Sequence, residues 1–174
     1  NGAMASAVNM LDDVHGGAGE QAVAFYGWID AGASVEAAID RWQAERTKYV
    51  PGFGHRFHTP EDPRAPRLLA LVAEAAEVGT VSGRFARIAM DVQQALNARA
   101  GKPVPMNIDG ATAVIYAELG FAGPLARGLF CLSRSVGILA HAWEQMEQGG
   151  RNKGPTPPEY RWTYTGENPI DDAG

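Results

Sequence analysis

The sequence predicts an all-α protein, and three observations support this prediction. Apolar residues recur at intervals of three and four along most of the 174 residues, as in helices with one buried face. Ser, Asp, Gly and Pro stand between these runs, where helices usually begin and end. No alternation of apolar and polar residues is long enough to indicate a strand.

Three helices are predicted in the first part of the chain. The first covers residues 4–14 and ends at His15-Gly16-Gly17, because glycine commonly terminates a helix. The second covers residues 20–29, and the third follows Ser34, a residue type that caps helix N-termini.

Four further helices follow a loop at residues 50–64. Capping residues mark their starts, and prolines exclude a helix across residues 101–109. The predicted starts are Asp62-Pro63, Ser82, Asp109 and Pro124, and the last helix ends near Gln148. The segment from Arg151 to Gly174 has four prolines and no helical period, so we expect it to wrap over a surface.

Composition excludes several classes of protein. The chain is 45% apolar and 20% charged, which is typical of a globular domain. A net charge of −5 argues against non-specific binding to nucleic acid or to anionic membranes. No apolar run reaches the roughly 20 residues of a membrane-spanning helix. With the single cysteine Cys131, which permits no intrachain disulfide, these features predict a cytoplasmic protein.

The loop at residues 50–64 is the strongest candidate for a functional site. It reads Val50-Pro51-Gly52-Phe53-Gly54-His55-Arg56-Phe57-His58 and closes with Asp62-Pro63-Arg64. Loops held by a rigid scaffold often carry binding and catalytic residues. A metal ion between His55 and His58 is conceivable, but Pro60 and the glycines leave no helix to aim both rings. No metal ligand is therefore predicted.

Three other residues each allow a structural and a functional interpretation. His15 suits a helix C-terminus, but the glycines after it would also let a ligand approach the ring. Arg134 interrupts the apolar pattern of the last helix, so it either extends to solvent or holds a carboxylate in a cleft. Asp109 is either the N-cap of the sixth helix or a catalytic carboxylate.

Taken together, these motifs resemble the citrate synthase superfamily, whose members include citrate synthase, 2-methylcitrate synthase and citryl-CoA lyase. The resemblance covers most of the chain and follows one order. The motifs are His15-Gly16-Gly17-Ala18, then Pro51 to Arg56 with Asp62-Pro63-Arg64, then Asn107-Ile108-Asp109, and finally Ser133 to Gly137 with Ala140-His141-Ala142-Trp143.

The resemblance implies a role for five side chains. Asp109 would remove a proton from the methyl group of acetyl-CoA, and His15 would donate a hydrogen bond to the thioester oxygen. His55 would polarise the keto group of a 2-oxo acid such as oxaloacetate and protonate the alkoxide that forms. Arg64 and Arg134 would hold the carboxylates of that substrate.

The resemblance also implies ligands, partners and domains. Coenzyme A enters as a thioester substrate, with no tightly bound cofactor, and the protein would form a homodimer or a larger homo-oligomer. Its pocket would be lined by Val50, Pro51, Gly52, Phe53, Gly54 and Arg56. Residues 17–123 would form the small, CoA-binding domain, and residues 1–16 and 124–174 would belong to the large domain.

Two departures from the family pattern keep other functions open. Family members usually carry a long segment before the first histidine motif, which here is at residue 15, so the chain resembles the carboxyl-terminal part of the fold. Many synthases end with Arg-Pro-Arg-x-x-Tyr-x-Gly, and here Glu159 stands at the place of the first arginine. The alternatives to a synthase are a lyase that cleaves (3S)-citryl-CoA, and a non-catalytic fragment that binds CoA or dimerises.

Overall fold

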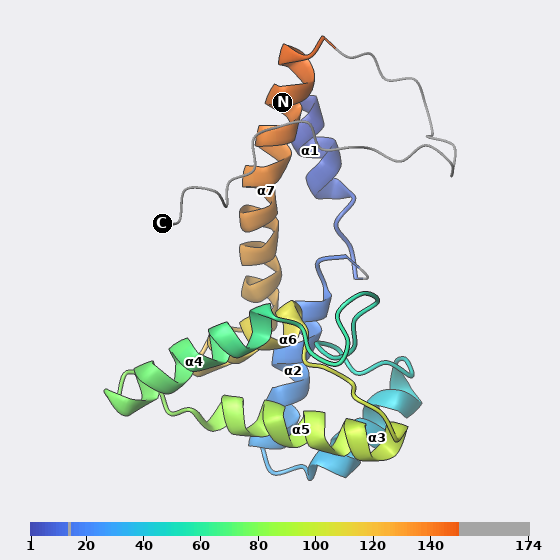
Figure 1. Ribbon diagram of the computed structural model, residues 1–174, viewed down its shortest axis with the longest axis vertical. Helices are drawn as coiled ribbons and strands as arrows, with labels where there is room; N and C mark the ends of the chain where they lie inside the picture. Colours follow the sequence, from blue (N-terminus) through green and yellow to red (C-terminus); the bar gives the residue numbers. More distant parts are fainter. Residues whose placement is uncertain (14, 150–174) are drawn as a thin grey trace.

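The computed structural model describes residues 1–13 and 15–149 (Figure 1). In these ranges the chain folds into helices and contains no strand, so the all-α prediction is confirmed. The helices are α1 (Gly2–Asn9), α2 (Ala18–Asp30), α3 (Val35–Glu45), α4 (Arg64–Glu77), α5 (Arg84–Ala100), α6 (Ile108–Glu118) and α7 (Gly123–Glu147).

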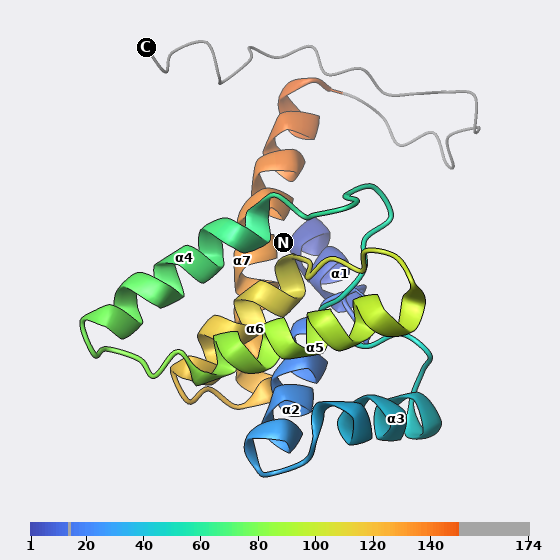
Figure 2. The same cartoon turned by 60° about the horizontal axis from the view of Figure 1, so that its bottom comes forward.

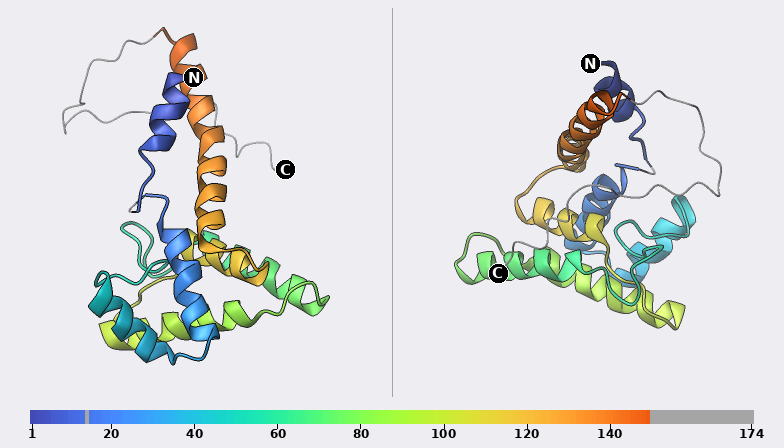
Figure 3. Two further views of the ribbon diagram at one scale, coloured as in Figure 1. Left: turned by 180° about the vertical axis from the view of Figure 1, so that it is seen from behind. Right: turned by 45° about the horizontal axis from the view of Figure 1, so that its top comes forward.

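Helices α2 to α6 form one cluster, and α1 and α7 extend from it side by side (Figures 1 and 3). α6 lies at the centre of the cluster, where it packs against α2, α4 and α5 (Figure 2). α3 closes one end by contacting α2 and α5.

The sequence of α6 explains its central place. Its buried positions are small or β-branched, so neighbouring backbones can come close on several sides; they are Gly110, Ala111, Ala113, Val114 and Ala117. α2 supplies the bulk that α6 lacks, through the fully buried rings of Phe25 and Tyr26. Phe25 also meets Trp42 of α3 edge to face, with ring centroids 5.9 Å apart.

Local capping confirms the predicted start of α3 but not that of α4. The Oγ atom of Ser34 accepts a hydrogen bond from the backbone N–H of Ala37, as an N-cap residue should. For α4 the N-cap is Pro63 and not Asp62, although Oδ1 of Asp62 accepts a hydrogen bond from the N–H of Arg64. The helix itself begins at Arg64, one residue later than predicted.

Two other predicted boundaries are wrong. The first helix ends at Asn9 instead of running toward residue 14, since Asp12 and Asp13 would put negative charge at the negative end of the helix dipole. The fifth helix begins at Arg84 and is capped mainly by Glu118 of α6, not by Ser82 alone. The Glu118 carboxylate accepts hydrogen bonds from the N–H groups of Ser82, Gly83 and Phe85.

The apolar stripe of α7 is largely exposed. Leu132 is 67% exposed, Val136 71% and Trp143 59%, whereas Ala126 is the buried residue of this helix. Nothing in residues 1–13 and 15–149 covers this face, although contiguous exposed apolar surface usually marks an interaction site. None of the described helices is both long enough and apolar enough to cross a membrane.

Candidate active site

The loop at residues 50–54 is fixed directly against the start of α6. Gly52 has φ +85°, a left-handed conformation that glycine adopts without strain. A Cβ atom built on Gly110 would lie 2.3 Å from the carbonyl oxygen of Gly52, so the two backbones meet with no room for a side chain. The loop therefore has one position relative to α6.

Backbone hydrogen bonds reinforce this contact. The N–H of Asn107 donates to the Gly52 carbonyl at 2.9 Å, and the N–H of Gly54 donates to the Pro105 carbonyl at 2.7 Å. Phe53 forms an isolated antiparallel bridge with Met106. The side chains of Val50 and Phe53 are buried, so any contribution of this loop to a ligand pocket comes from its backbone.

His55 follows the loop and has a defined hydrogen-bonding state. Its Nδ1 atom accepts hydrogen bonds from the backbone N–H groups of Phe57 at 3.1 Å and His58 at 3.0 Å. A ring nitrogen that accepts cannot carry the proton, so neutral His55 carries it on Nε2. His55 can therefore donate from Nε2 to a substrate oxygen.

Asp62 and Arg64 form a two-pronged ion pair beside this histidine. Asp62 is fully buried, and its two oxygens accept from Nε and Nη2 of Arg64 at 2.9 and 2.7 Å. The hydrogen bonds from Arg64 lower the pKa of Asp62 to about 2 despite its burial. The Arg64 side chain remains 46% exposed, so its guanidinium group is oriented and still accessible to a ligand.

Asp109 lies in the first turn of α6 and is not its N-cap. The cap is Asn107, whose Oδ1 atom accepts from the N–H groups of Asp109 and Gly110 at 3.0 and 3.2 Å. The N-cap interpretation of Asp109 is therefore wrong, and its carboxylate does not cap the helix.

Burial raises the pKa of the Asp109 carboxyl above its ordinary value. The positive charges of Arg64, His15 and Arg134 act in the opposite direction. The group is thus a partly desolvated carboxylate near two arginines and a histidine that come from three separate parts of the chain. A raised pKa makes this carboxylate a stronger base than an exposed one.

His15 and Arg134 contact each other. An Nη atom of Arg134 lies 3.4 Å from Nε2 of His15, and the guanidinium group stacks over the ring of Phe130, 5.0 Å from its centroid. Gly16, which follows His15, packs against the same ring. The sequence allowed Arg134 either to extend to solvent or to hold a carboxylate in a cleft. Its exposed side chain agrees with both interpretations, but its contact with His15 favours a position in the site.

The structure thus places three of the five predicted side chains, His15, Arg64 and Arg134, where their charges act on a fourth, the carboxylate of Asp109. His55 lies in the same loop region, where its ring centroid is 4.3 Å from that of His58. Arg56 is exposed beside it. The roles of these residues, and that of the 50–54 loop in CoA binding, stay predictions.

His55, His58 and Asp62 are also close enough to coordinate one metal ion, since their ligand atoms lie within 4.8 Å of one another. Both Asp62 oxygens already bind Arg64, and Nδ1 of His55 already accepts two N–H groups. A metal ion would have to displace Arg64, so the donor set suits the ion pair better than a metal.

Sequence reasoning missed two residues that hold the site in place. Asn107 carries a recognisable signal, since asparagine is a favoured N-cap residue. Arg127 of α7 carries none, because its partners are far away in the sequence. It pairs with Asp13 at 2.5 Å and with Glu20, and so ties the segment before His15 to α2 and α7.

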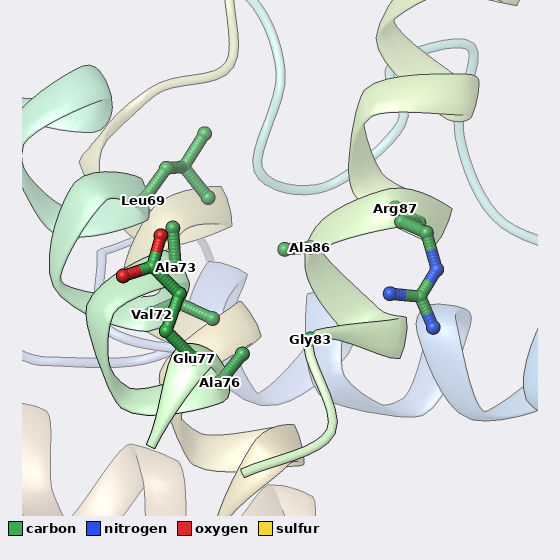
Figure 4. Close-up of a pocket in the computed structure, with 8 residues that line it drawn as sticks. All are labelled: Leu69, Val72, Ala73, Ala76, Glu77, Gly83, Ala86 and Arg87. Atoms are coloured by element: carbon green, nitrogen blue, oxygen red, sulfur yellow. The ribbon is translucent and has the colours of Figure 1, made fainter. Parts of the chain in front are cut away.

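A separate open cavity of about 470 Å³ lies between α4 and α5 (Figure 4). Apolar side chains such as Leu69 and Val72 line most of it, with Glu77 and Arg87 at its edge. None of the predicted site residues borders this cavity.

Comparison with known proteins agrees with the geometry of the site. A family model described as "Citrate synthase, C-terminal domain" matches residues 2–155. The chain belongs to this family. Citrate synthase of Acidithiobacillus ferridurans is 34% identical over 157 residues, which are 88% of this chain and 39% of that protein. Citrate synthase of Haloferax volcanii is 28% identical, over 97% of this chain and 42% of its own length.

Solved structures of the citrate synthase family have the same fold. Citryl-CoA lyase from Hydrogenobacter thermophilus superposes with a TM-score of 0.71 and 31% identity, over 95% of this chain and 63% of that one. Citrate synthase from Thermoplasma acidophilum, in complex with carboxymethyl coenzyme A and oxaloacetate, superposes with a TM-score of 0.62 and 26% identity, over 88% and 42%. The chain therefore spans less than two thirds of the length of each of these proteins.

Proposed function

We propose that this chain carries the reacting side chains of a citrate synthase-type acyltransferase, which condenses acetyl-CoA with a 2-oxo acid such as oxaloacetate. The observation that supports this most directly is the environment of Asp109. Its carboxylate has a raised pKa, lies at a helix N-terminus and is surrounded by two arginines and a histidine. Coenzyme A acts here as part of a substrate, with no tightly bound cofactor.

In this reaction Asp109 accepts a proton from the methyl carbon of the thioester. The electron pair left on that carbon is delocalised onto the thioester oxygen, where a hydrogen bond from His15 stabilises the developing charge. The enol carbon then attacks the keto carbon of the 2-oxo acid and forms the new carbon–carbon bond. The keto oxygen takes its proton from Nε2 of His55, and the product is citryl-CoA, whose thioester is hydrolysed in a synthase.

The two arginines serve the second substrate. Arg64 is held by Asp62 in an orientation that leaves its guanidinium group accessible, and a planar guanidinium binds a carboxylate through two hydrogen bonds. Arg134 lies beside His15 and can hold a second carboxylate. Both charges also favour ionised Asp109, so substrate clamp and base are electrostatically linked.

A second candidate is cleavage of citryl-CoA to acetyl-CoA and oxaloacetate by the same residues in reverse. The structural likeness to the citryl-CoA lyase of Hydrogenobacter thermophilus favours it. Glu159, which stands at the place of the first arginine of the synthase pattern, lies outside the described residues.

We further propose that residues 17–123 form the small domain and that residues 1–16 and 124–174 belong to the large one, in a homodimer or a larger homo-oligomer. Two observations support this division. α1 and α7 project together from the cluster of α2 to α6, and the apolar face of α7 is exposed.

Two assays on the purified chain test the function. One measures thiol release from acetyl-CoA with oxaloacetate, and the other measures acetyl-CoA formed from citryl-CoA. Asp109→Ala should abolish turnover in the productive direction and leave CoA affinity largely unchanged. Asp91→Ala, which removes an exposed carboxylate on α5, is the matched control and should keep full activity. If the wild-type chain is inactive in both assays, it is a CoA-binding or dimerising module.

A further inference from the structure

The side chain of Asn107 joins two segments that carry the proposed reacting groups. On one side its Oδ1 atom accepts from the N–H groups of Asp109 and Gly110, at 3.0 and 3.2 Å. On the other side its Nδ2 atom donates to the carbonyl oxygen of Gly54 at 2.9 Å. Both ends of one amide group are therefore used, and each end holds a different segment.

The two segments are those of Asp109 and His55. Gly54 immediately precedes His55, and the Oδ1 bonds fix the first turn of α6, in which Asp109 lies. These segments are 53 residues apart at the point where the amide bridges them. The backbone contact of Gly52 with Gly110 keeps them from moving closer. The Asn107 amide keeps them from separating, together with the backbone hydrogen bond from the N–H of Gly54 to the Pro105 carbonyl.

A short amide suits this task better than an apolar contact. Apolar packing is non-directional, whereas hydrogen bonds to both ends of a planar group fix distance and orientation together. Asn107 itself is anchored by its own N–H, which donates to the Gly52 carbonyl at 2.9 Å. The bridge therefore has little freedom to rotate.

We propose that Asn107 is a positioning residue that sets the spacing between the base Asp109 and the proton donor His55. The inference rests on the proposed function, because it assigns Asn107 to the alignment of that same site. The enol carbon must form its bond within about 3.5 Å of the keto carbon, and a displacement of about 1 Å lowers rates by about 100-fold. Loss of the bridge therefore lowers kcat, while substrate binding through Arg64 is retained.

Asn107→Ser separates the two functions of this side chain. Serine caps helices about as well as asparagine, so the hydrogen bonds to the first turn of α6 are kept. It has no amide nitrogen to reach Gly54, so the bridge alone is lost. Asn97→Ser is the matched control, because Asn97 also uses a side-chain amide to hold backbone, accepting from the N–H of Val104 at 2.6 Å.

The experiment measures kcat, KM for the 2-oxo acid and Tm for the wild type and both variants. We expect Asn107→Ser to lower kcat about 10- to 100-fold, with KM for the 2-oxo acid within about threefold of wild type. Asn97→Ser should lower Tm at least as much and leave kcat within about twofold. Equal losses of kcat in the two variants, or an unchanged kcat in Asn107→Ser, would overturn the proposal.

A second measurement decides the inference independently of turnover. The imidazole resonances of His55, recorded by heteronuclear NMR, report the position of its ring. Asn107→Ser should shift or broaden them and Asn97→Ser should not. If the wild type is inactive in both directions, the proposed function fails, and unchanged His55 resonances in Asn107→Ser would then refute the bridge as well.

Discussion

The contact between Gly52 and Gly110 predicts that a single methyl group at residue 110 destabilises the protein. In an open helix, Gly→Ala stabilises by up to about 1 kcal/mol, since alanine loses less backbone entropy on folding. At residue 110 the new Cβ would lie 2.3 Å from the Gly52 carbonyl oxygen and 2.9 Å from Cγ of Met106. The nearer partner is backbone, so the whole loop must move.

The net effect can be worked out from these contacts. Overpacking of this kind costs about 1–3 kcal/mol. Moving the loop also weakens the bond from the Asn107 N–H to the Gly52 carbonyl, worth about 1 kcal/mol. After the helical gain is subtracted, Gly110→Ala should lose about 1–3 kcal/mol, which for a chain of this size lowers Tm by roughly 2–12 °C.

The assay is thermal unfolding followed by circular dichroism, with Gly27→Ala as the matched control. Gly27 lies within α2, and a Cβ built there meets nothing within 4 Å. This variant should raise Tm by about 2–4 °C. Shifts of the same sign and similar size in both variants would refute the close approach of the loop to α6.

Three further predictions concern hydrogen bonds and charges. Burial acts to raise the pKa of Glu118, but the hydrogen bonds that it accepts outweigh this and lower it. Glu118→Gln should therefore lower the free energy of unfolding, measured in urea at pH 7, by about 1–2 kcal/mol. The difference from wild type should shrink as the pH falls below about 4.3, the ordinary pKa of Glu, and through the lowered pKa of the folded state. Tyr26→Phe removes a buried hydroxyl that donates to the Gly110 carbonyl at 3.3 Å, and should lose about 1 kcal/mol by the same measurement. Since burial raises the pKa of Tyr26, wild-type stability should also fall as pH rises above about 10, and that of the phenylalanine variant should fall less. Arg64→Gln removes a charge that lowers the pKa of Asp109, so the acid limb of the kcat/KM profile should move to higher pH. An unchanged acid limb would show that the charge of Arg64 does not act on Asp109.

The elements that the sequence predicted well are those set by local interactions. Ser34 caps α3 through a bond three residues away, and the apolar period of the helices follows from their own geometry. The predicted end of the first helix was wrong because the prediction followed the apolar period of Val8 and Leu11 and gave no weight to the charges of Asp12 and Asp13. The spacing of apolar residues also identified the apolar face of α7, but this spacing does not show which part of a protein packs against that face.

The candidate site shows the same division. Motif order was enough to predict that His15, Arg64, Asp109 and Arg134 belong together, and the structure places the other three where their charges act on Asp109. The residues that hold them were not predicted from the sequence. Arg127 pairs with Asp13 and Glu20 across more than 100 residues, and no local pattern announces a partner at that distance.

The helical cluster and the site are stabilised by different forces, and this difference determines how variants should behave. The small residues of α6 and the rings of α2 form an apolar core, in which substitutions mainly change stability. Three polar contacts, which we call joints, hold the site. Asn107 bonds to Gly54 and Asp109, Asp62 pairs with Arg64, and Arg127 pairs with Asp13, near His15. Each joint fixes orientation through directional bonds and adds little apolar burial. Removing one joint should therefore leave the helices folded and misalign the reacting groups, which is the opposite of what truncating Phe25 or Tyr26 should do.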